Sequence, residues 1–373
     1  MKDSQITMYE HSEVKVKLLN KYIQKYLNIL SRAQAFDKVQ LFDLFCGEGI
    51  YQNGGEGSPI IFMKAIKDVY FRNQAEGQKT IKVDCVFNDK EPSKTDKVKA
   101  YIEQKKLHYQ FLGDLRFKNM DYVEALPLVV RQISITKNSK SFVFIDPYGY
   151  SEVRASQIKS ILETKKAEVL LFLPTQHMFR FERKGAPKAL HSFIKELVPL
   201  NQWPNSHTGI EFIENLKSAF RDYLGNEYFV DSFIITRDKN QFFCLFFFTS
   251  HIYGFEKMLE SKWEIDHEEG RGWSYKNPEA PTLFTSSTAD RLNKLELFFR
   301  SFLKESRTNG EIYEATLHQG FRPTHAVEVL KGLAAQNQLI VTPTDGLKWR
   351  KGSYYIKYDD YCNRPNRISI QLT

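Results

Sequence analysis

Apolar and polar residues along the first part of the chain follow two periods, one typical of helices and one typical of buried strands. Over residues 11–34 apolar side chains recur every three or four positions, which predicts an amphipathic helix. Short apolar runs bounded by turn residues predict strands at 39–45, 81–87, 109–112 or 116–120, 141–145 and 168–173. Helical patterns separate them at 93–105, 122–132 and 156–164. Strands that alternate with helices predict a parallel sheet with crossover connections.

Two later apolar runs, 228–236 and 241–249, are separated by a short polar turn. This spacing predicts a hairpin, so the last strand should run antiparallel. Five parallel strands followed by such a hairpin are typical of the Rossmann-like sheet of class I methyltransferases. We therefore expect an α/β domain of this class, with seven strands and a leading helix, over residues 1–267.

A second unit is expected near the end of the chain. Residues 268–287 are rich in Gly, Pro, Ser and Thr and predict a linker. Beyond it, helical patterns cover 291–303, 311–318 and 322–336, and apolar runs at 339–341 and 354–356 flank a turn, which predicts a hairpin. Three helices and a hairpin predict a small winged-helix-like α+β domain over residues 288–373.

Composition narrows the class of protein. The chain has 373 residues, 42% of them hydrophobic, and a net charge of +8, which favours a polyanionic partner such as DNA or RNA. The apolar runs are much shorter than the ~20 residues of a membrane span, so we expect a soluble, cytoplasmic protein with no membrane partner. The four cysteines have no CxxC spacing, which argues against a zinc site or a disulfide framework, and no metal is expected.

The lysines of the leading helix lie off its apolar face. They can be solvated surface residues or can contact phosphates, and the pattern favours the solvated interpretation. They are Lys15, Lys17, Lys21 and Lys25.

A glycine turn follows the first predicted strand. Asp43, Phe45, Gly47 and Gly49 stand in the segment DLFCGEG, and the next helix is expected to begin at Ser58. Such a turn brings backbone N–H groups and a helix amino end close to a ligand's negative group. The third glycine of GxGxxG is missing, which argues against a dinucleotide. S-adenosylmethionine, which carries a carboxylate, fits the turn, and the alternative is a plain strand-to-helix turn.

Two acidic residues follow the next strands. Asp89 comes directly after the second strand, where a carboxylate can accept both ribose hydroxyls of a nucleoside. It lies further from Gly49 than the dinucleotide pattern expects, and its alternative role is local turn bonding. Asp121 can meet the adenine amino group in the methyltransferase pattern or can cap the helix from Tyr122.

The fourth strand delivers Asp146, Pro147 and Tyr148 to the carboxyl edge of the sheet. An acid and a proline carbonyl can hold an exocyclic amine there, and the aromatic ring can stack on a planar base. The order resembles the D/N-P-P-Y/F motif of amino-group methyltransferases, without its second proline, and is closer to that of tRNA (guanine-N2) dimethyltransferases. The alternative is a strand-to-helix turn.

With these residues in place the chain resembles the three-Cys-motif partner protein family, over residues 11–263. The matching segments are HSEVKVKLLNKYIQKYL, FDLFCGEGIYQNGGEGSP, VFNDKE, FVFIDPYG and FFCLFFFTSHIYGFEKM. The resemblance implies a methyltransferase-like domain, a winged-helix-like tail in some members and a partner protein that carries the three cysteines. It supplies no substrate.

The tail carries candidate contacts to nucleic acid. Arg322, Thr324 and Lys331 lie on or just before its third helix, where a winged helix reads DNA, whereas Lys348 and Arg350 fall on the expected second hairpin strand. Winged helices also dock proteins, and Glu328 on the third helix weakens the DNA interpretation.

Together these patterns predict an S-adenosylmethionine-dependent methyltransferase that acts on an exocyclic amino group of a nucleic-acid base. Asp146, Pro147 and Tyr148 would be its catalytic residues, and the cofactor would be bound by Asp43, Phe45, Gly47, Gly49, Asp89 and Asp121. The alternative is a non-catalytic methyltransferase-like module that docks a three-Cys-motif partner while the tail binds nucleic acid or protein.

Overall fold

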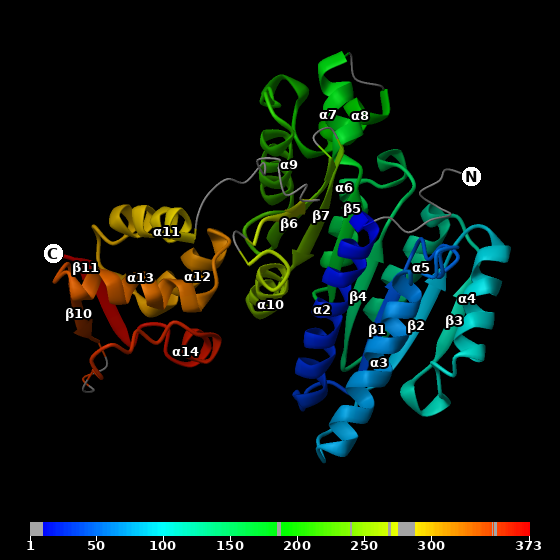
Figure 1. Ribbon diagram of the computed structural model, residues 1–373, viewed down its shortest axis with the longest axis horizontal. Coiled ribbons are helices and arrows are strands. Elements are labelled where there is room, and N and C mark those ends of the chain that lie inside the picture. Colours follow the sequence, from blue (N-terminus) through cyan, green and yellow to red (C-terminus); the bar gives the residue numbers. More distant parts are fainter. Residues whose placement is uncertain are drawn as a thin grey trace. The chain divides into compact units, whose positions relative to one another are not determined.

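The computed structural model describes residues 10–184, 188–238, 241–267, 270–274, 288–344, 346 and 349–373. The chain divides into two compact units (Figure 1). The first comprises Met1–His251 with Trp273–Tyr275, and the second comprises Ile252–Gly272 with Lys276–Thr373.

The first unit is built on one mixed sheet with the spatial order β3-β2-β1-β4-β5-β7-β6-β8. Strands β1 to β5 pair in parallel, and β7 runs antiparallel to both β5 and β6. Apart from β8, this order and the reversed β7 are those of the Rossmann-like class I methyltransferase sheet. The strands are β1 (Lys38–Asp43), β2 (Lys82–Asn88), β3 (Leu115–Lys118), β4 (Ser139–Ile145), β5 (Ala167–Leu173), β6 (Phe229–Asp238), β7 (Gln241–Thr249) and β8 (Gly272–Ser274).

The sequence predicted the α/β class, the parallel strands and the antiparallel hairpin, and the structure confirms them. The count of seven strands was wrong, because β8 adds an eighth strand at the edge. β8 has only three residues and lies in the segment expected to be a linker, where no apolar alternation marks a strand. Most of that segment lies outside the described residues. Of the two candidates for the third strand, 116–120 matches β3, whereas Gln110–Leu112 forms a 3-10 turn.

Helices cover both faces of this sheet. α2, α3 and α4 pack in succession, and α5, α6, α8 and α9 form a second series of neighbours. Figure 1 shows α2 and α3 side by side in front of the strands. The helices are α2 (Glu10–Arg32), α3 (Ser58–Ala75), α4 (Pro92–Gln104), α5 (Tyr122–Ile135), α6 (Ala155–Leu162), α7 (Thr175–Lys184), α8 (Lys188–Leu197) and α9 (Gly209–Leu224).

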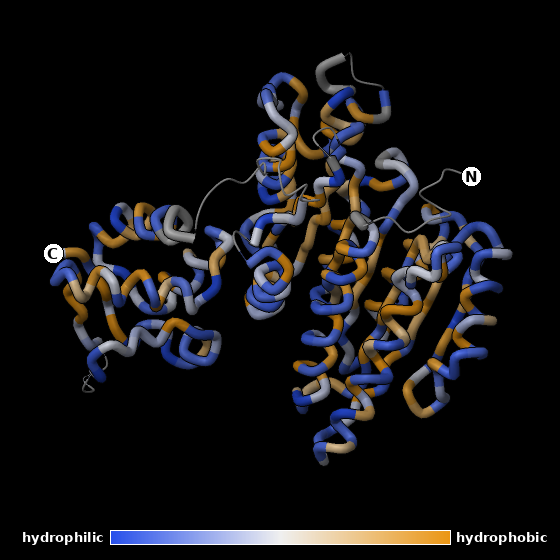
Figure 2. The backbone as a smooth tube through the Cα atoms, viewed as in Figure 1, coloured by the Kyte–Doolittle hydropathy of each residue, from blue (hydrophilic) through white to orange (hydrophobic). Residues whose placement is uncertain are grey.

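Helix α2 is held against the sheet by two tyrosines as well as by apolar packing. Tyr22 donates a hydrogen bond to Glu168, and Tyr26 donates one of 2.9 Å to the carbonyl of Ser141. The Tyr22 ring also lies 4.9 Å from the ring of Phe247. Burial raises the pKa of Glu168 to about 7, although the hydrogen bonds from Tyr22 and Thr249 lower it. Figure 2 shows that hydrophobic residues concentrate along the strands beneath these helices.

The second unit combines helices with a small antiparallel sheet of order β10-β11-β9. Its core is formed by buried side chains of the helices and of β11, including Leu295, Phe299, Ile312, Leu330 and Ile370. The elements are α10 (Ile252–Trp263), α11 (Thr288–Phe302), β9 (Arg307–Thr308), α12 (Asn309–His318), α13 (Pro323–Ala335), β10 (Leu339–Pro343), α14 (Tyr358–Asn363) and β11 (Ile368–Leu372).

The expected hairpin of this unit was wrong in its second strand. β10 pairs with β11 near the end of the chain, and residues 354–356 form no strand. Tyr354 and Ile356 are nevertheless buried, and the Tyr354 hydroxyl donates to the carbonyl of Leu330. An apolar run alone does not distinguish a buried loop from a strand.

Candidate functional site

The loop after β1 is a tight turn that requires glycine at two positions. Gly47 and Gly49 have φ values of +60° and +72°, in the left-handed region. A Cβ on Gly49 would lie 2.9 Å from Cγ2 of Val98, whereas one on Gly47 would meet no atom within 4 Å. The amide of Gly57 closes the loop with a 2.7 Å hydrogen bond to the carbonyl of Gly49. The backbone at Gly47 therefore faces open space at the carboxyl edge of the sheet.

Asp43 ends β1 and is fully buried beneath this turn. Its Oδ1 accepts a 3.3 Å hydrogen bond from the amide of Phe45, and its Oδ2 has no hydrogen-bond partner among the described residues. Burial raises the pKa of Asp43 to about 7, partly offset by the neighbouring Ser58 hydroxyl. The helix α3 begins at Ser58, as the sequence predicted, with Gly57 in the cap position.

Asp89 follows β2 and contacts the glycine turn directly. Its Oδ2 accepts a 3.2 Å hydrogen bond from the amide of Gly47, and its Oδ1 accepts one of 3.0 Å from the amide of Glu91. Asp89 therefore lies where a ribose-binding acid is expected, and it also makes the local turn bond that was the alternative. The loop after Gly49 and the 18-residue α3 account for its distance along the chain.

Three aromatic side chains gather beside Asp89. The ring of Phe45 stacks on that of Tyr122 at 5.1 Å, and the ring of Tyr148 meets Phe45 edge-on at 6.4 Å. The Tyr148 hydroxyl donates to Oδ2 of Asp89 at 3.3 Å. The structure thus brings Tyr148, predicted to hold the acceptor, into contact with two residues predicted to hold the cofactor.

Lys94 on α4 was not predicted as a site residue, yet it fixes Tyr148 in place. Its ammonium group donates to the Tyr148 hydroxyl at 2.7 Å and lies 4.6 Å from the centre of that ring. It also lies 3.7 Å from Oδ1 of Asp89. Burial raises the pKa of Tyr148 to about 12, so the hydroxyl stays protonated. The position of Lys94 on the first turns of α4 gave no sequence signal for this role.

Asp121 caps α5, and its carboxylate accepts a 2.9 Å hydrogen bond from the amide of Val123. This is the local role that the sequence left open, and the side chain is exposed. Contact with an adenine amino group stays a prediction for this residue.

Asp146 directly follows β4 and forms an ion pair with a lysine of α2. Lys15 forms an ion pair with the Asp146 carboxylate, and its ammonium lies 4.6 Å from the centre of the Phe172 ring. Burial lowers the pKa of Lys15, but the charge and hydrogen bond of Asp146, together with Tyr51 and Asp43, more than offset this, so the pKa of Lys15 is raised and its ammonium stays protonated. The solvated interpretation of Lys15 was wrong. Pro147 is buried beside the pair, whereas Tyr148 is 42% exposed.

The neighbours of Lys15 in the sequence do not reveal its burial. Val14, Val16 and Leu18 are buried together with Lys15, so the start of α2 is covered on more than one face. Lys17 also stands between two of these apolar residues, yet it is exposed, so this pattern does not distinguish a buried lysine from a solvated one.

The predicted tail residues that the structure describes differ in their exposure and local contacts. Arg322 precedes α13, donates to His325 and lies 5.4 Å from the centre of the Trp263 ring. Thr324 and Lys331 are exposed on α13, and Glu328 is exposed on the same helix. Arg350 is exposed in a loop and not in the expected strand, and Lys348 lies outside the described residues.

Two surface pockets lie on the first unit, and neither is lined by a predicted site residue, although one borders the glycine turn. One is lined by Glu48 and Ile50 of the glycine turn together with Lys97, Ala100, Tyr101 and Gln104 of α4. The other lies near the start of β1 and is lined by Lys38, Gln40, Asp84, Arg116, Leu128, Arg131, Gln132, Ile135 and Thr136. Within the described ranges no group of three or more His, Cys, Asp or Glu residues could hold a metal ion. No helix in the described part of the chain has the length and apolar character needed to cross a membrane.

Comparisons with known proteins give structural likeness only. No family model matches the chain, and no curated protein matches its sequence. A protein from Legionella pneumophila str. Philadelphia 1, of family-model DUF519, is similar at 11% identity and a TM-score of 0.40, covering 69% of this chain and 92% of that one. An O-methyltransferase from Bacillus cereus in complex with SAH is similar at 12% identity and a TM-score of 0.33, covering 61% and 80%. Such low TM-scores assign no activity to this chain.

Proposed function

We propose that this protein is an S-adenosylmethionine-dependent methyltransferase that acts on an exocyclic amino group of a nucleic-acid base. The observation that carries the proposal is the contact series Gly47–Asp89–Tyr148 at the carboxyl edge of the sheet. It joins the glycine turn, the acid after β2 and the aromatic residue after β4 in one place. Open α/β sheets bind their ligands at this edge.

The residues at this edge fit the cofactor. The backbone of Gly47 faces open space, and Asp43 has a buried carboxylate oxygen without a hydrogen-bond partner among the described residues. Asp89 would hold the ribose. Of the hydrogen bonds that its carboxylate accepts, the 3.3 Å one from Tyr148 is the longest and therefore the weakest. Phe45, Gly49 and Asp121 would complete the binding site. When bound, the cofactor supplies a methyl group on a sulfonium, which is a good leaving group.

Asp146, Pro147 and Tyr148 would hold the acceptor. The ion pair with Lys15 holds the Asp146 carboxylate in place, where it would accept a hydrogen bond from the base amino group and orient the nitrogen lone pair. The exposed ring of Tyr148 would stack on the base. The work of these residues is mainly positioning, which requires no strong base.

The second unit would add nucleic-acid contacts. We include in the proposal a winged-helix-like domain over residues 288–373, joined through residues 268–287 to a domain of residues 1–267. Thr324, Lys331 and Arg350 would contact nucleic acid directly, because their side chains are exposed. Because the chain resembles the three-Cys-motif partner family, the proposal also includes a protein partner that carries the three cysteines.

Two measurements on the full chain test the function. Calorimetry with S-adenosylmethionine and its demethylated product should give saturable binding, and tritiated methyl groups should be transferred to DNA, tRNA or rRNA. Asp146→Asn should abolish transfer, with Asp114→Asn as a control because Asp114 is an exposed acid paired with Arg116 at 2.9 Å. Absence of cofactor binding would overturn the proposal. Binding without transfer to any of the three acceptors would favour the non-catalytic binding module.

A further inference from the structure

Four aromatic side chains form a cluster on the surface of the first unit, which we call the aromatic platform. Tyr70 and Phe71 come from the last turns of α3, and Tyr109 and Phe111 come from the segment before β3. The rings of Tyr109 and Phe111 are stacked at 5.3 Å with only 7° between their planes. Phe111 also lies 5.2 Å from Tyr70 and 6.3 Å from Phe71.

The platform is open to solvent. Phe71 is 41% exposed and Phe111 is 47% exposed. A soluble protein gains nothing in stability from leaving large aromatic rings in water, and contiguous exposed apolar patches mark binding surfaces. The cluster is therefore a candidate contact surface.

Cationic residues lie in the same two segments of the chain as these rings, and one of them contacts a ring. The ammonium of Lys67 lies 5.4 Å from the centre of the Tyr109 ring and donates to the carbonyl of Lys106 at 3.0 Å. Arg72, Lys105 and Lys106 are exposed. Arg72 donates to the side chain of Asn28, and the ammonium of Lys105 lies 5.8 Å from the centre of the Tyr101 ring.

The charge around the platform is positive. Among the described residues no carboxylate forms an ion pair with Lys67, Arg72, Lys105 or Lys106. Acidic residues in the same segments, Asp68 and Glu103, are fewer than these cations. The positive charge around the rings is thus left to attract a negatively charged ligand.

We propose that the aromatic platform binds single-stranded nucleic acid by stacking unpaired bases on Phe71 and Phe111 while Lys67, Arg72, Lys105 and Lys106 contact the phosphates. Sequence-tolerant binding of single strands combines these two elements, aromatic rings and a positively charged surface. A duplex keeps its bases stacked inside and cannot offer them to the rings. A protein partner is disfavoured because the core of a protein interface is depleted in lysine.

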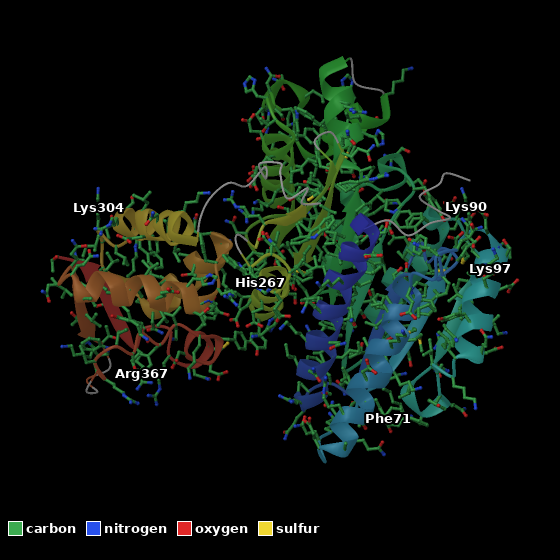
Figure 3. All side chains as sticks on the ribbon, viewed as in Figure 1. Phe71, Lys90, Lys97, His267, Lys304 and Arg367 are labelled. Atoms are coloured by element: carbon green, nitrogen blue, oxygen red, sulfur yellow. The ribbon has the colours of Figure 1, made fainter. Side chains whose placement is uncertain are left out.

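The platform is separate from the candidate methyl-transfer site. Figure 3 shows Phe71 at the lower end of the first unit, whereas Lys90 and Lys97, which follow β2 near the glycine turn, lie higher in the view. α3 begins at the glycine turn and ends at the platform, and its 18 residues span about 27 Å. The inference goes beyond the proposed function, because such binding does not depend on methyl transfer.

Fluorescence anisotropy of the full chain with labelled oligo(dT) and oligo(U) of about sixteen nucleotides tests this. The wild type should bind both single strands, and because the second unit would bind nucleic acid separately, the contribution of the platform is the affinity lost in the aromatic variant. The double variant Phe71→Ser/Phe111→Ser should bind at least tenfold more weakly, consistent with about 1 to 3 kcal/mol per stacked base. The matched control Leu128→Ser/Ile135→Ser changes two residues of α5 that are 51% and 68% exposed and should bind like the wild type.

A second variant leaves the aromatic residues in place, so it tests the proposal even if the aromatic variant fails to fold. Lys67→Gln/Lys106→Gln should weaken binding and make it less dependent on salt, by a slope of about 0.7 for each lost phosphate contact. The inference is overturned if the wild type binds no single strand, if the aromatic variant loses duplex binding as much as single-strand binding, or if the aromatic variant folds and binds single strands unchanged. If the chain fails these tests but still binds the cofactor normally, only this inference is overturned. Loss of cofactor binding with normal oligonucleotide binding overturns the proposed function alone.

Discussion

The ammonium of Lys15 forms an ion pair with the carboxylate of Asp146, although 131 positions separate the two residues in the chain. Lys15 is 7% exposed and lies against Phe172, so its charge has little access to water. An unpaired charge in such a place is costly. Any substitution of Asp146 therefore affects both the acceptor site and a buried lysine.

Asp146→Ala should lower the free energy of unfolding by about 3 kcal/mol, the cost of leaving one member of a buried pair alone. The double variant Lys15→Met/Asp146→Leu should recover most of that loss, because no charge is left buried. Urea denaturation measures both values. A double variant as unstable as Asp146→Ala would show that Asp146 acts by shaping the turn.

Asp89→Ala should weaken cofactor binding by about 1 to 3 kcal/mol, the range for losing hydrogen bonds to a charged group. Calorimetry with the demethylated product measures the change. Asp114→Ala, an exposed acid after the neighbouring loop, serves as the control and should leave the affinity unchanged. Equal affinities for Asp89→Ala and the wild type would remove Asp89 from the site.

Tyr148→Phe and Tyr148→Ala should separate the two roles of this side chain. Phe keeps the ring but removes the 3.3 Å contact to Asp89, so cofactor affinity should stay within a few-fold of wild type and transfer should continue. Ala also removes the stacking surface and should raise the KM for the nucleic-acid acceptor by an amount corresponding to about 1 to 3 kcal/mol. Initial rates at varied acceptor concentration provide the comparison. Equal loss in both variants would assign the role to the hydroxyl.

Gly47→Ala and Gly49→Ala should differ in what they damage. Each alanine in the left-handed region costs about 1 to 2 kcal/mol. At Gly49 the new methyl would also press on Val98, so this variant should be the less stable in urea. At Gly47 the methyl would enter open space, so its main effect should be on cofactor affinity. Cofactor binding that survives Gly47→Ala unchanged would place the ligand elsewhere.

Glu168→Gln should flatten the dependence of stability on pH. Burial raises the pKa of Glu168 from 4.5 to about 7, so the neutral acid is the form that the fold favours. Its stabilising contribution is complete below pH 4.5 and is lost as the pH rises through 7, a change of about 3 kcal/mol. Between pH 4.5 and 7 the wild type should therefore lose stability relative to the glutamine variant. Urea denaturation across this range, with the exposed Glu227→Gln as control, measures the difference.

The strand order was predictable because buried strands appear in the sequence as short apolar runs, as in 141–145 and 168–173. Strand β8 was not predictable, since a three-residue edge strand carries no period. The partner of β10 was misassigned because Tyr354 and Ile356 are buried without pairing.

The candidate site was predictable where one strand end carries the residue, as at Asp43 and Asp89. Lys15 and Lys94 were missed because each reaches its partner from a helix, across 131 and 54 positions of sequence. No local pattern records such a contact, since Lys17 is flanked by buried apolar residues as Lys15 is and is nevertheless exposed.

The contacts of α2 have a consequence for the order in which the molecule is made. Its side chains bond to partners 115, 131 and 146 positions further along the chain. During synthesis α2 leaves the ribosome before β4 and β5 have been made. Its amphipathic face therefore stays exposed until those strands form. Contacts of such long sequence separation are slow to form because the intervening loop must close first. A nascent chain that has not reached Asp146 therefore holds a glycine turn without the lysine–aspartate pair, and the proposed acceptor side of the site is completed after the proposed cofactor side.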